Sequence, residues 1–392
     1  MRFGVGGAAM SRTGFVYDPA TAAFQREMQA VYRTLRDEHP VYAAPDGAFV
    51  LSRFEDVWNA VNDWASFSSA GVAEAAQLQP QMIYMDPPDH TALRRLVSRA
   101  FTPKRVADLE PRARAVADAL LTKMAAAGGG DLVHEFASPL PSTIMSDLIG
   151  VPEEHRAAFQ GWIEAFLEVT SPDDIAGRAT NIYTLFGSLL AERRDAPADD
   201  LMSALLSAQV DGDSLSDDDL LGFCFLLLVA GNDTTTSLIG NGVELLARNK
   251  DQRAELAADP SLIPGAVEEM LRIESPTQAL SRTAMRDVEL HGSTIPAGSR
   301  VMLLWGSANL DDREFPDPEV FDIHRRAPRH LGFGHGIHVC LGAALARLES
   351  RVAFEELLAR SPEYEVSGEP ERYISNWARA WRLLPLQFER VR

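Results

Sequence analysis

The chain has 392 residues, with 37 Lys and Arg against 56 Asp and Glu, so its formal charge is -19 at pH 7. A negative charge of this size repels a phosphate backbone and excludes broad nucleic-acid binding. The two cysteines, Cys224 and Cys340, are too few and too far apart for a disulfide framework. No apolar stretch of signal-peptide length or of the roughly 18 residues of a membrane span is evident. The composition therefore predicts a soluble, cytoplasmic protein with neither nucleic-acid nor membrane partners.

Helical periodicity dominates the chain, because apolar residues recur at three- and four-residue intervals. The windows with this pattern are 88–127, 152–168, 178–194, 199–209, 217–249, 262–274 and 341–359. Strand patterns, with alternating or β-branched residues, occur at 48–54, 288–305 and 384–390. No internal repeat, low-complexity tract or linker separates these elements. The sequence therefore predicts a single, mainly α domain over 1–392 with a small β part, and we expect residues 1–14 to be flexible.

The helix predicted over 217–249 is long and apolar, with Ser216 as its N-cap and acidic residues in its first turn. Its middle is polar, with the run Gly-Asn-Asp-Thr-Thr-Thr over 231–236. Polar side chains in a buried helix are costly unless they are hydrogen-bonded or used in chemistry. One interpretation is that the hydroxyls bond to the preceding turn and bend the helix. The other is a functional site.

The segment FGHGIHVCLG over 333–342 presents Cys340 just ahead of the next predicted helix. The N–H groups and the dipole at a helix N-terminus favour an anion, so we expect a thiolate at Cys340. Gly334 and Gly336 permit backbone conformations that other residues resist, and Phe333 offers an apolar shelf. A thiolate, a closely approaching backbone and an apolar surface together suit haem iron held by a cysteine.

Two other interpretations of this segment remain. Cys340 is also compatible with a purely structural residue at a helix cap. His335, His338 and Cys340 are compatible with a zinc site, but the sequence offers no fourth ligand at a recognised spacing.

The same segment resembles the haem-binding signature of the cytochrome P450 family. The matching positions are Phe333, Gly334, His338, Cys340 and Gly342. This resemblance implies the family's triangular, α-rich prism around a buried haem b, with Cys340 as the axial ligand of the iron. It also implies a monooxygenase of the soluble bacterial type, which inserts one atom of O2 into a small hydrophobic substrate.

The resemblance extends to the polar run of the central helix. In the family an acid followed by an alcohol lies beside the oxygen-binding face, and Asp233 and Thr234 occupy these two positions. The resemblance implies catalytic roles for both, with Thr234 holding a water molecule and Asp233 relaying protons inward. A widened helical turn at Ala230 and Gly231 is expected beside the cofactor.

Cationic partners for the two haem propionates are expected from separate segments of the chain. His90 and Arg94 are four residues apart on one helical face and match the H-x-x-x-R pattern of soluble family members. Arg282 and His338 match the remaining propionate contacts of the family.

The motif EEMLR over 268–272 places Glu269 and Arg272 on one face of a predicted helix. By itself such a pair is typical of a surface ion pair that contributes little to stability. The resemblance implies instead a structural network, which Arg325 completes.

The resemblance implies that electrons from NAD(P)H arrive through a ferredoxin and its reductase. The resemblance also implies that the ferredoxin docks on the proximal face near Cys340, flanked by basic side chains that would steer an acidic partner. These side chains are Arg95, Arg99, Lys104 and Arg105 on one side and Arg325, Arg326 and Arg329 on the other. A solvated surface explains the first group equally well.

The substrate pocket is expected to be apolar, which predicts a hydrophobic substrate of moderate size. The expected lining residues are Met82, Ile83, Phe166, Leu226, Val229, Leu280 and Trp377. Apolar residues of this kind are also typical of a protein core. Arg379, two residues after Trp377, could pair with an acid on the substrate, but a surface position is expected.

Hydroxylation of a C–H bond is the predicted reaction. A peroxide-driven peroxygenase would use the same haem, but relatives of that type lack the acid and alcohol that Asp233 and Thr234 supply. A non-catalytic haem carrier or gas sensor is the remaining alternative, although the sequence contains no recognisable output domain.

Overall fold

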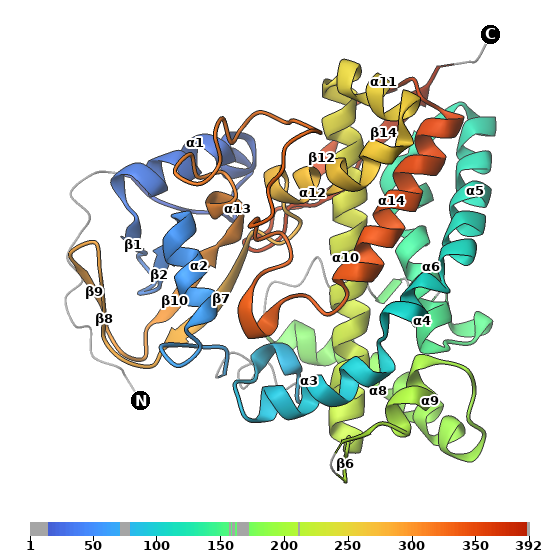
Figure 1. Cartoon of the computed structure of the whole chain (residues 1–392), viewed down its shortest axis with the longest axis horizontal. Coiled ribbons are helices and arrows are strands. Elements are labelled where there is room, and N and C mark those ends of the chain that lie inside the picture. The colour runs from blue at the N-terminus through green and yellow to red at the C-terminus, as the bar shows by residue number, and fades with distance from the viewer. Residues whose placement is uncertain are drawn as a thin grey trace.

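The computed structural model describes residues 15–70, 79–156, 158, 161–162, 172–210 and 212–389. Helices form a block around one long helix, and a smaller sheet region lies to one side of this block (Figure 1). The mainly α fold with a small β part is therefore confirmed. Residues 1–14, for which flexibility is expected, lie outside the described residues.

The helices follow the chain in this order. They are α1 (Ala22–Glu38), α2 (Phe54–Asn62), η2 (Met82–Tyr84), α3 (Asp89–Ala100), α4 (Pro103–Ala107), α5 (Glu110–Ala127), the π-helical turn η3 (Val133–Ala137), α6 (Pro139–Ile149), α8 (Pro172–Asp195), α9 (Leu201–Leu206), α10 (Asp217–Arg248), α11 (Lys250–Ala258), η4 (Pro260–Leu262), α12 (Ile263–Ile273), α13 (Trp305–Ala308), η5 (Gly336–His338) and α14 (Ala343–Arg360).

The strands are short and form small sheets. They are β1 (Val41–Ala43), β2 (Phe49–Leu51), β3 (Phe67–Ser68), β4 (Gly129–Asp131), β5 (Gln209–Val210), β6 (Asp213–Ser214), β7 (Ala279–Ala284), β8 (Val288–Leu290), β9 (Ser293–Ile295), β10 (Arg300–Leu304), β11 (Tyr364–Val366), β12 (Glu371–Arg372), β13 (Trp381–Leu383) and β14 (Pro385–Phe388). The largest described sheet has the order β1-β2-β10-β7-β3, and its β2–β10 pair is parallel while the other pairs are antiparallel.

Helix α10 forms the centre of the helical block and packs against α6, α8, α12 and α14. Ser216 caps it as predicted, because its hydroxyl accepts from the Asp219 N–H while the Asp219 carboxylate accepts from the Ser216 N–H. Gly242 allows a close approach of three helices, since a Cβ there would lie 2.5 Å from Phe354 Cζ and 2.6 Å from Met270 Sδ.

Helix α10 is long and apolar enough to cross a membrane by length and composition alone, so the expectation that no segment of this kind is present is wrong. However, 67% of its most apolar window is buried inside the molecule. A helix that is mostly buried in a protein core loses the amphipathic pattern of a surface helix and has the same apolar composition as a membrane span.

Most predicted elements are confirmed. Helices α3 to α5 fill the window 88–127, helices α8, α9, α10, α12 and α14 match their windows, and strands β2, β8, β9, β10 and β14 lie within the predicted strand windows. In the window 152–168, residues 153–156, 158, 161 and 162 are helical, and the others lie outside the described residues.

Several elements were not predicted, among them α1, α2, α6, α11 and β7. Helix α6 contains Pro139 and Pro141, which usually interrupt helices. Both lie in its first turn, where a backbone N–H has no intrahelical partner to lose.

Candidate active site

One face of α10 is accessible although the helix lies in the middle of the molecule. Leu226, Val229 and Thr234 are half-buried and Ala230 is exposed, whereas Phe225, Leu227 and Leu228 are buried. Residues 229, 230 and 234 share one helical face with Leu226, because they follow it by three, four and eight positions. The central helix therefore presents an apolar stripe that ends in a hydroxyl.

The polar run of α10 is tied to its own backbone. Thr234 Oγ1 donates to the Ala230 carbonyl at 2.8 Å, and Asn232 Nδ2 donates to the Leu228 carbonyl at 2.8 Å. Local bonding of the side chains to the preceding turn, one of the two sequence interpretations, is thus present. It does not exclude the functional interpretation, because Thr234 lies on the accessible face. Asp233, next to it, is buried.

The expected widened turn at Ala230 and Gly231 is wrong. Helix α10 is α-helical throughout its length. A Cβ at Gly231 would lie 2.3 Å from Met145 Cε of α6, so this glycine serves close helix packing.

The loop that carries Cys340 is shaped by two glycines in the left-handed region, Gly334 at φ 66° and Gly336 at φ 68°. A Cβ at Gly336 would lie 2.7 Å from the Val61 carbonyl oxygen, so only glycine fits without a shift of the backbone. The Cys340 N–H donates to the Phe333 carbonyl at 3.0 Å and closes the loop. Phe333 packs against the same core cluster as Leu226 and Val229 of α10.

The expectation of a thiolate at Cys340 is not met by the protein alone. The residue is exposed, but the protein atoms packed around its thiol partly desolvate it and raise its pKa. The N–H of Gly342 and the charge of Arg94 lower the pKa only in part. Desolvation therefore outweighs the helix N-terminus here. A coordinated metal cation reverses this balance, because it deprotonates the thiol that binds it.

The four side chains expected at the haem propionates come together from three segments. His90 of α3 and His338 have ring centroids 4.4 Å apart, and Arg94 Nη2 donates to the Val339 carbonyl at 2.7 Å. Arg282 of β7 is buried and donates to its neighbour's carbonyl, that of Ser281, at 2.9 Å.

This cluster carries more positive than negative charge. Burial, followed by the charges of Arg282 and His90, lowers the pKa of His338 to about 3. The charge of Asp86 acts on His90, Arg282 and His338 and offsets their lowered pKa values only in part. Both ring nitrogens of His90 are buried and have no hydrogen-bond partner among the residues that the structure describes. Buried cations and an unsatisfied imidazole need an anion, and the two propionates of a haem fit this requirement.

Ser69 belongs to the same cluster, although the sequence reading missed it. Its Oγ lies 3.0 Å from Nε2 of His338 and so orients the ring. The two residues are 269 positions apart, and no local motif marks the serine.

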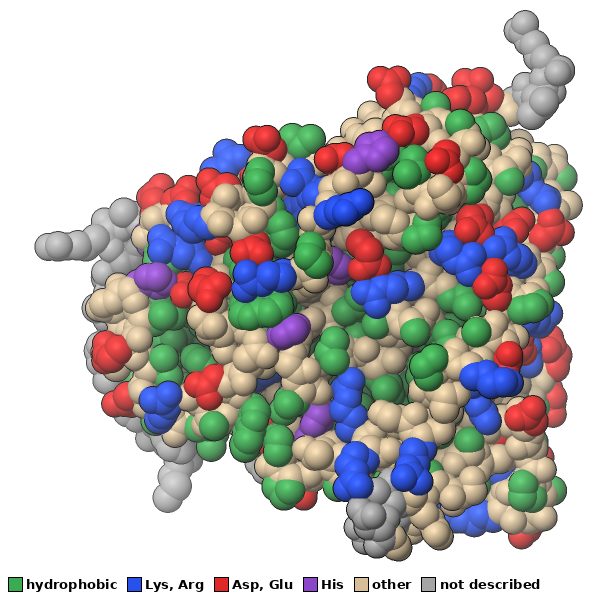
Figure 2. Space-filling view, in the orientation of Figure 1, with side chains coloured by type: hydrophobic (Ala, Val, Ile, Leu, Met, Phe, Trp, Pro, Cys, Tyr) green, Lys and Arg blue, Asp and Glu red, His purple; other side chains and the backbone are tan. Residues whose placement is uncertain are grey.

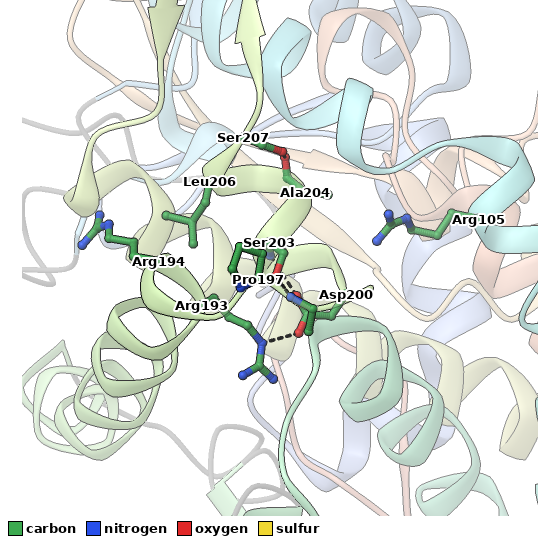
Figure 3. A pocket seen from close by; sticks show the side chains of 10 residues that line it. Arg105, Arg193, Arg194, Pro197, Asp200, Ser203, Ala204, Leu206 and Ser207 are labelled. Atoms are coloured by element: carbon green, nitrogen blue, oxygen red, sulfur yellow. Dashed lines mark hydrogen bonds and ion pairs between the residues drawn. The ribbon is translucent and has the colours of Figure 1, made fainter.

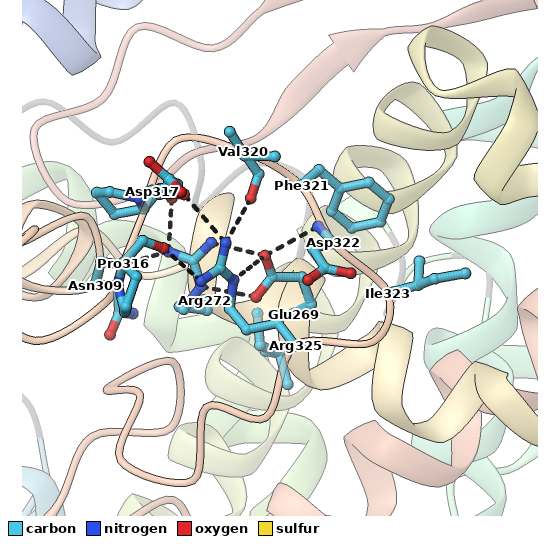
Figure 4. Close-up of polar contacts among 12 residues, drawn as sticks. Glu269, Arg272, Asn309, Pro316, Asp317, Val320, Phe321, Asp322, Ile323 and Arg325 are labelled. Atoms are coloured by element: carbon cyan, nitrogen blue, oxygen red, sulfur yellow. Dashed lines mark hydrogen bonds and ion pairs between the residues drawn. The ribbon is translucent and has the colours of Figure 1, made fainter.

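Glu269, Arg272 and Arg325 form one buried network (Figure 4). Arg272 donates to both Glu269 oxygens at 2.7 Å, and Arg325 Nε donates to Oε1 at 3.0 Å. The side chains of the first pair are 0% exposed, so a surface ion pair is excluded. Arg272 and Arg325 also donate to backbone carbonyls of Asn309, Pro316, Asp317, Pro318 and Val320. The network therefore fastens the segment before the Cys340 loop to α12.

The zinc interpretation is not supported by the geometry. His335 stacks on Trp58, with ring centroids 3.9 Å apart, while His338 joins the His90 cluster. Across the described part of the chain, no three His, Cys, Asp or Glu side chains form a group that could hold a metal ion.

Only some of the residues expected around the substrate are accessible. Ile83, Leu226, Val229, Leu280 and Trp377 are half-buried, Met82 is buried in the core, and Phe166 lies outside the described residues. Arg379 is not at the surface as expected. It is 8% exposed and its Nε donates to Glu274 at 2.8 Å.

Some of the basic residues expected near the redox partner are exposed to solvent, and others make contacts within the protein. Arg95, Arg99 and Arg326 are exposed, and Figure 2 shows Lys and Arg side chains gathered over α3. Arg325 is not available for docking, because it lies in the Glu269 network. Arg329 covers the Trp58 ring, 4.5 Å from its centroid.

A surface pocket of about 570 Å³ lies between α8 and α9, and of the residues expected near the redox partner Arg105 lines it (Figure 3). Its arginines are already paired with acids: Arg193 with Asp200 at 2.5 Å, Arg105 with Asp199 at 3.8 Å, and Arg194 with Asp217. The pocket therefore offers no surplus charge for an anionic ligand.

An α-rich fold that joins one accessible cysteine, an accessible helix face and an unbalanced cationic cluster defines a haem-thiolate protein. The family description "Cytochrome P450" matches residues 259–373. "Cytochrome P450 130" of Mycobacterium tuberculosis is 44% identical over 373 residues, which cover 89% of this chain and 91% of the relative. The "Vitamin D(3) 25-hydroxylase" of Pseudonocardia autotrophica is 42% identical and covers 91% of this chain and 92% of its own. This chain belongs to the cytochrome P450 family and is a P450 monooxygenase.

Solved structures agree with this assignment. Cytochrome P450 CYP109Q5 from Chondromyces apiculatus has a TM-score of 0.90 at 39% identity, covering 95% of this chain and 98% of that one. CYP109E1 from Bacillus megaterium, solved in complex with testosterone, has a TM-score of 0.85 at 34% identity, covering 92% and 99%. The expected P450 fold is therefore confirmed, and the family's haem iron is the cofactor that the site fits.

Proposed function

We propose that this enzyme hydroxylates a C–H bond of a small hydrophobic molecule with one atom of O2. The observation that carries the proposal is the accessible face of α10, where the apolar stripe of Leu226, Val229 and Ala230 ends at Thr234. Such a surface binds an apolar molecule and places a single hydroxyl beside it.

Haem supplies the redox chemistry when it is bound, and a cysteine ligand favours O–O cleavage. Cys340 would hold the iron, and Phe333 with Gly334 would form the supporting loop. Four side chains would hold the propionates, namely His90, Arg94, Arg282 and His338. Of these, His90 has both ring nitrogens ready to bond.

Thr234 and Asp233 would handle protons. Thr234 uses its hydroxyl hydrogen for the Ala230 carbonyl, so the lone pairs of Oγ1 remain to accept from a water molecule. The Asp233 carboxyl, one residue earlier, would pass protons to that water.

A hydrophobic substrate is supported by the apolar lining and by what two similar proteins bind or act on. One relative is a vitamin D3 hydroxylase, and one similar structure contains testosterone. Both are small, mostly apolar, polycyclic molecules, which favours a substrate of this class for the present chain.

Electrons from NAD(P)H would reach the enzyme through a ferredoxin and its reductase. The exposed Arg95, Arg99 and Arg326 favour an acidic partner on the face near Cys340. We also propose that residues 1–392 act as a single domain in the cytoplasm, without a nucleic-acid or membrane partner.

Turnover in 18O2 with ferredoxin, reductase and NADPH tests the proposal, with a panel of steroids and other apolar molecules. We expect one 18O atom per product molecule. Turnover with hydrogen peroxide but not with ferredoxin would favour a peroxygenase. Oxygen binding without any product would favour a haem carrier or sensor.

A further inference from the structure

Asn241 lies on the same face of α10 as Thr234, seven residues and therefore two helical turns further on, about 10 Å along the axis. It is fully buried. Its Nδ2 donates to the Arg379 carbonyl at 2.9 Å and to the Glu274 carbonyl at 3.2 Å, and its Oδ1 accepts from Arg372 at 3.0 Å. One side chain thus uses both its donor and its acceptor on three separate segments.

Two of these segments carry residues expected around the substrate. Glu274 leads into the segment 276–280, and Arg379 ends the segment 376–379, which contains Trp377. The two segments are paired with each other, because Gln278 N–H donates to the Trp377 carbonyl at 2.7 Å and Arg379 N–H donates to the Pro276 carbonyl at 2.8 Å. Asn241 therefore holds a joined pair of segments rather than two independent loops.

Ion pairs also hold the place where Asn241 meets the two segments, which we call the junction. Glu274 is buried and lies 2.8 Å from Arg379 Nε and 3.5 Å from Arg372 Nη2. Although burial favours the neutral acid, these two guanidinium groups hold the pKa of Glu274 at about 2. Arg379 also donates to the carbonyl and the side-chain oxygen of Gln25 in α1. Each group is fixed by at least two partners, so the junction has little freedom to move.

We propose that Asn241 is a positioning residue that sets the distance between the α10 face and the 276–280 and 376–379 segments, and so selects substrates by size. The inference rests on the proposed function, because it takes the α10 face as one wall of the substrate pocket. Asn241 itself is too buried to touch the substrate and acts through the two segments that it holds.

The test compares two iron-binding probes on haem-loaded protein. Imidazole is small, whereas 4-phenylimidazole carries a ring that must fit between the α10 face and the opposite segments. Asn241→Ala should weaken 4-phenylimidazole about ten-fold, since a small displacement of a positioned wall has large effects, while imidazole binding stays within about two-fold. Dissociation constants follow from the Soret shift.

Asn249→Ala is the matched control. Asn249 lies at the end of the same helix, and its side-chain Nδ2 donates to the Leu245 carbonyl of the helix's own last turn. Both dissociation constants should remain within about two-fold of wild type in this variant.

Arg372→Lys covers the case in which Asn241→Ala does not fold. Lysine keeps the charge but cannot bond Asn241 and stack on Trp381 with one planar group. The dissociation constant of 4-phenylimidazole divided by that of imidazole should therefore rise about three-fold. An unchanged ratio in the variants, or equal weakening of both probes, would overturn the inference. A wild-type protein without any Soret shift would instead contradict the proposed function.

Discussion

Thr234 donates its hydroxyl hydrogen to the carbonyl oxygen of Ala230, 2.8 Å away and one turn earlier in α10. This bond fixes the rotamer of the threonine and leaves its oxygen as an acceptor on the accessible face of the helix. Both residues lie on the stripe that begins at Leu226. A hydroxyl in this arrangement is suited to holding a proton donor next to a bound apolar molecule.

Thr234→Ala should therefore separate substrate binding from productive turnover. We expect the substrate dissociation constant to change little, while the product formed per NAD(P)H falls roughly ten-fold or more and peroxide accumulates. Thr236→Ala is the control, because Thr236 donates to the Ala137 carbonyl of η3 at 3.2 Å. Unchanged coupling in Thr234→Ala would remove this residue from the proton path.

Cys340→Ser should abolish the red-shifted Soret band of the reduced carbonyl complex, because an oxygen ligand does not supply the thiolate's electron density. Cys224→Ala should retain the band. Cys224 of α10 is buried in the protein core. Burial raises the pKa of its thiol to about 12, so this cysteine is unreactive. A normal band in Cys340→Ser would show that another group binds the iron.

Glu269→Gln should lower the free energy of unfolding by about 3–5 kcal/mol, since it leaves Arg272 and Arg325 buried without their carboxylate. Its neighbour supplies the matched control. Glu268 is 32% exposed and bonds Arg347 and His330, so Glu268→Gln should cost about 1 kcal/mol or less. Urea denaturation of both variants measures the difference, and equal losses would contradict the structural role of the buried network.

Gly336→Ala should lower the free energy of unfolding more than Gly292→Ala does. Both glycines have positive φ, 68° and 76°, but a Cβ at Gly336 would meet the Val61 carbonyl oxygen at 2.7 Å, whereas one at Gly292 meets nothing within 4 Å. We expect losses of about 2–3 kcal/mol at Gly336 and about 1 kcal/mol at Gly292. Haem retention on a gel-filtration column should also fall only in Gly336→Ala. Equal effects would show that the loop can shift to accept the methyl group.

Glu349 of α14 should make stability depend on pH. Burial raises its pKa to about 8, and a hydrogen bond from Thr235 offsets this only in part. Between pH 4.5 and 8 the folded protein then binds a proton that the unfolded chain has released. The stability that this bound proton contributes is fully present below pH 4.5 and is lost as the pH rises towards 8. The free energy of unfolding then falls by at most about 1.4 kcal/mol per pH unit.

Glu349→Gln removes the titration but keeps the size and a donor group. Its free energy of unfolding, measured by urea denaturation at several pH values, should rise relative to wild type as the pH increases from 5 to 8. Parallel curves for the two proteins would show that Glu349 does not titrate in this range.

Features that depend on neighbouring residues could be predicted from the sequence. The cap at Ser216, the length of α10 and the glycine loop before Cys340 are all local, because they depend on backbone bonds and conformations within a few positions. The order of these segments was also enough to suggest the P450 family.

Features that depend on burial and on distant partners were decided by the tertiary structure alone. The pKa of Cys340, the buried ion pair of Arg379 and the contact between Ser69 and His338 each depend on how segments far apart in the chain pack together. Asn241 shows the reason most clearly, since it bonds a carbonyl 138 residues away. Residue type and spacing describe which side chains share an element, but the dielectric surroundings and partners of a side chain exist only after the elements have packed.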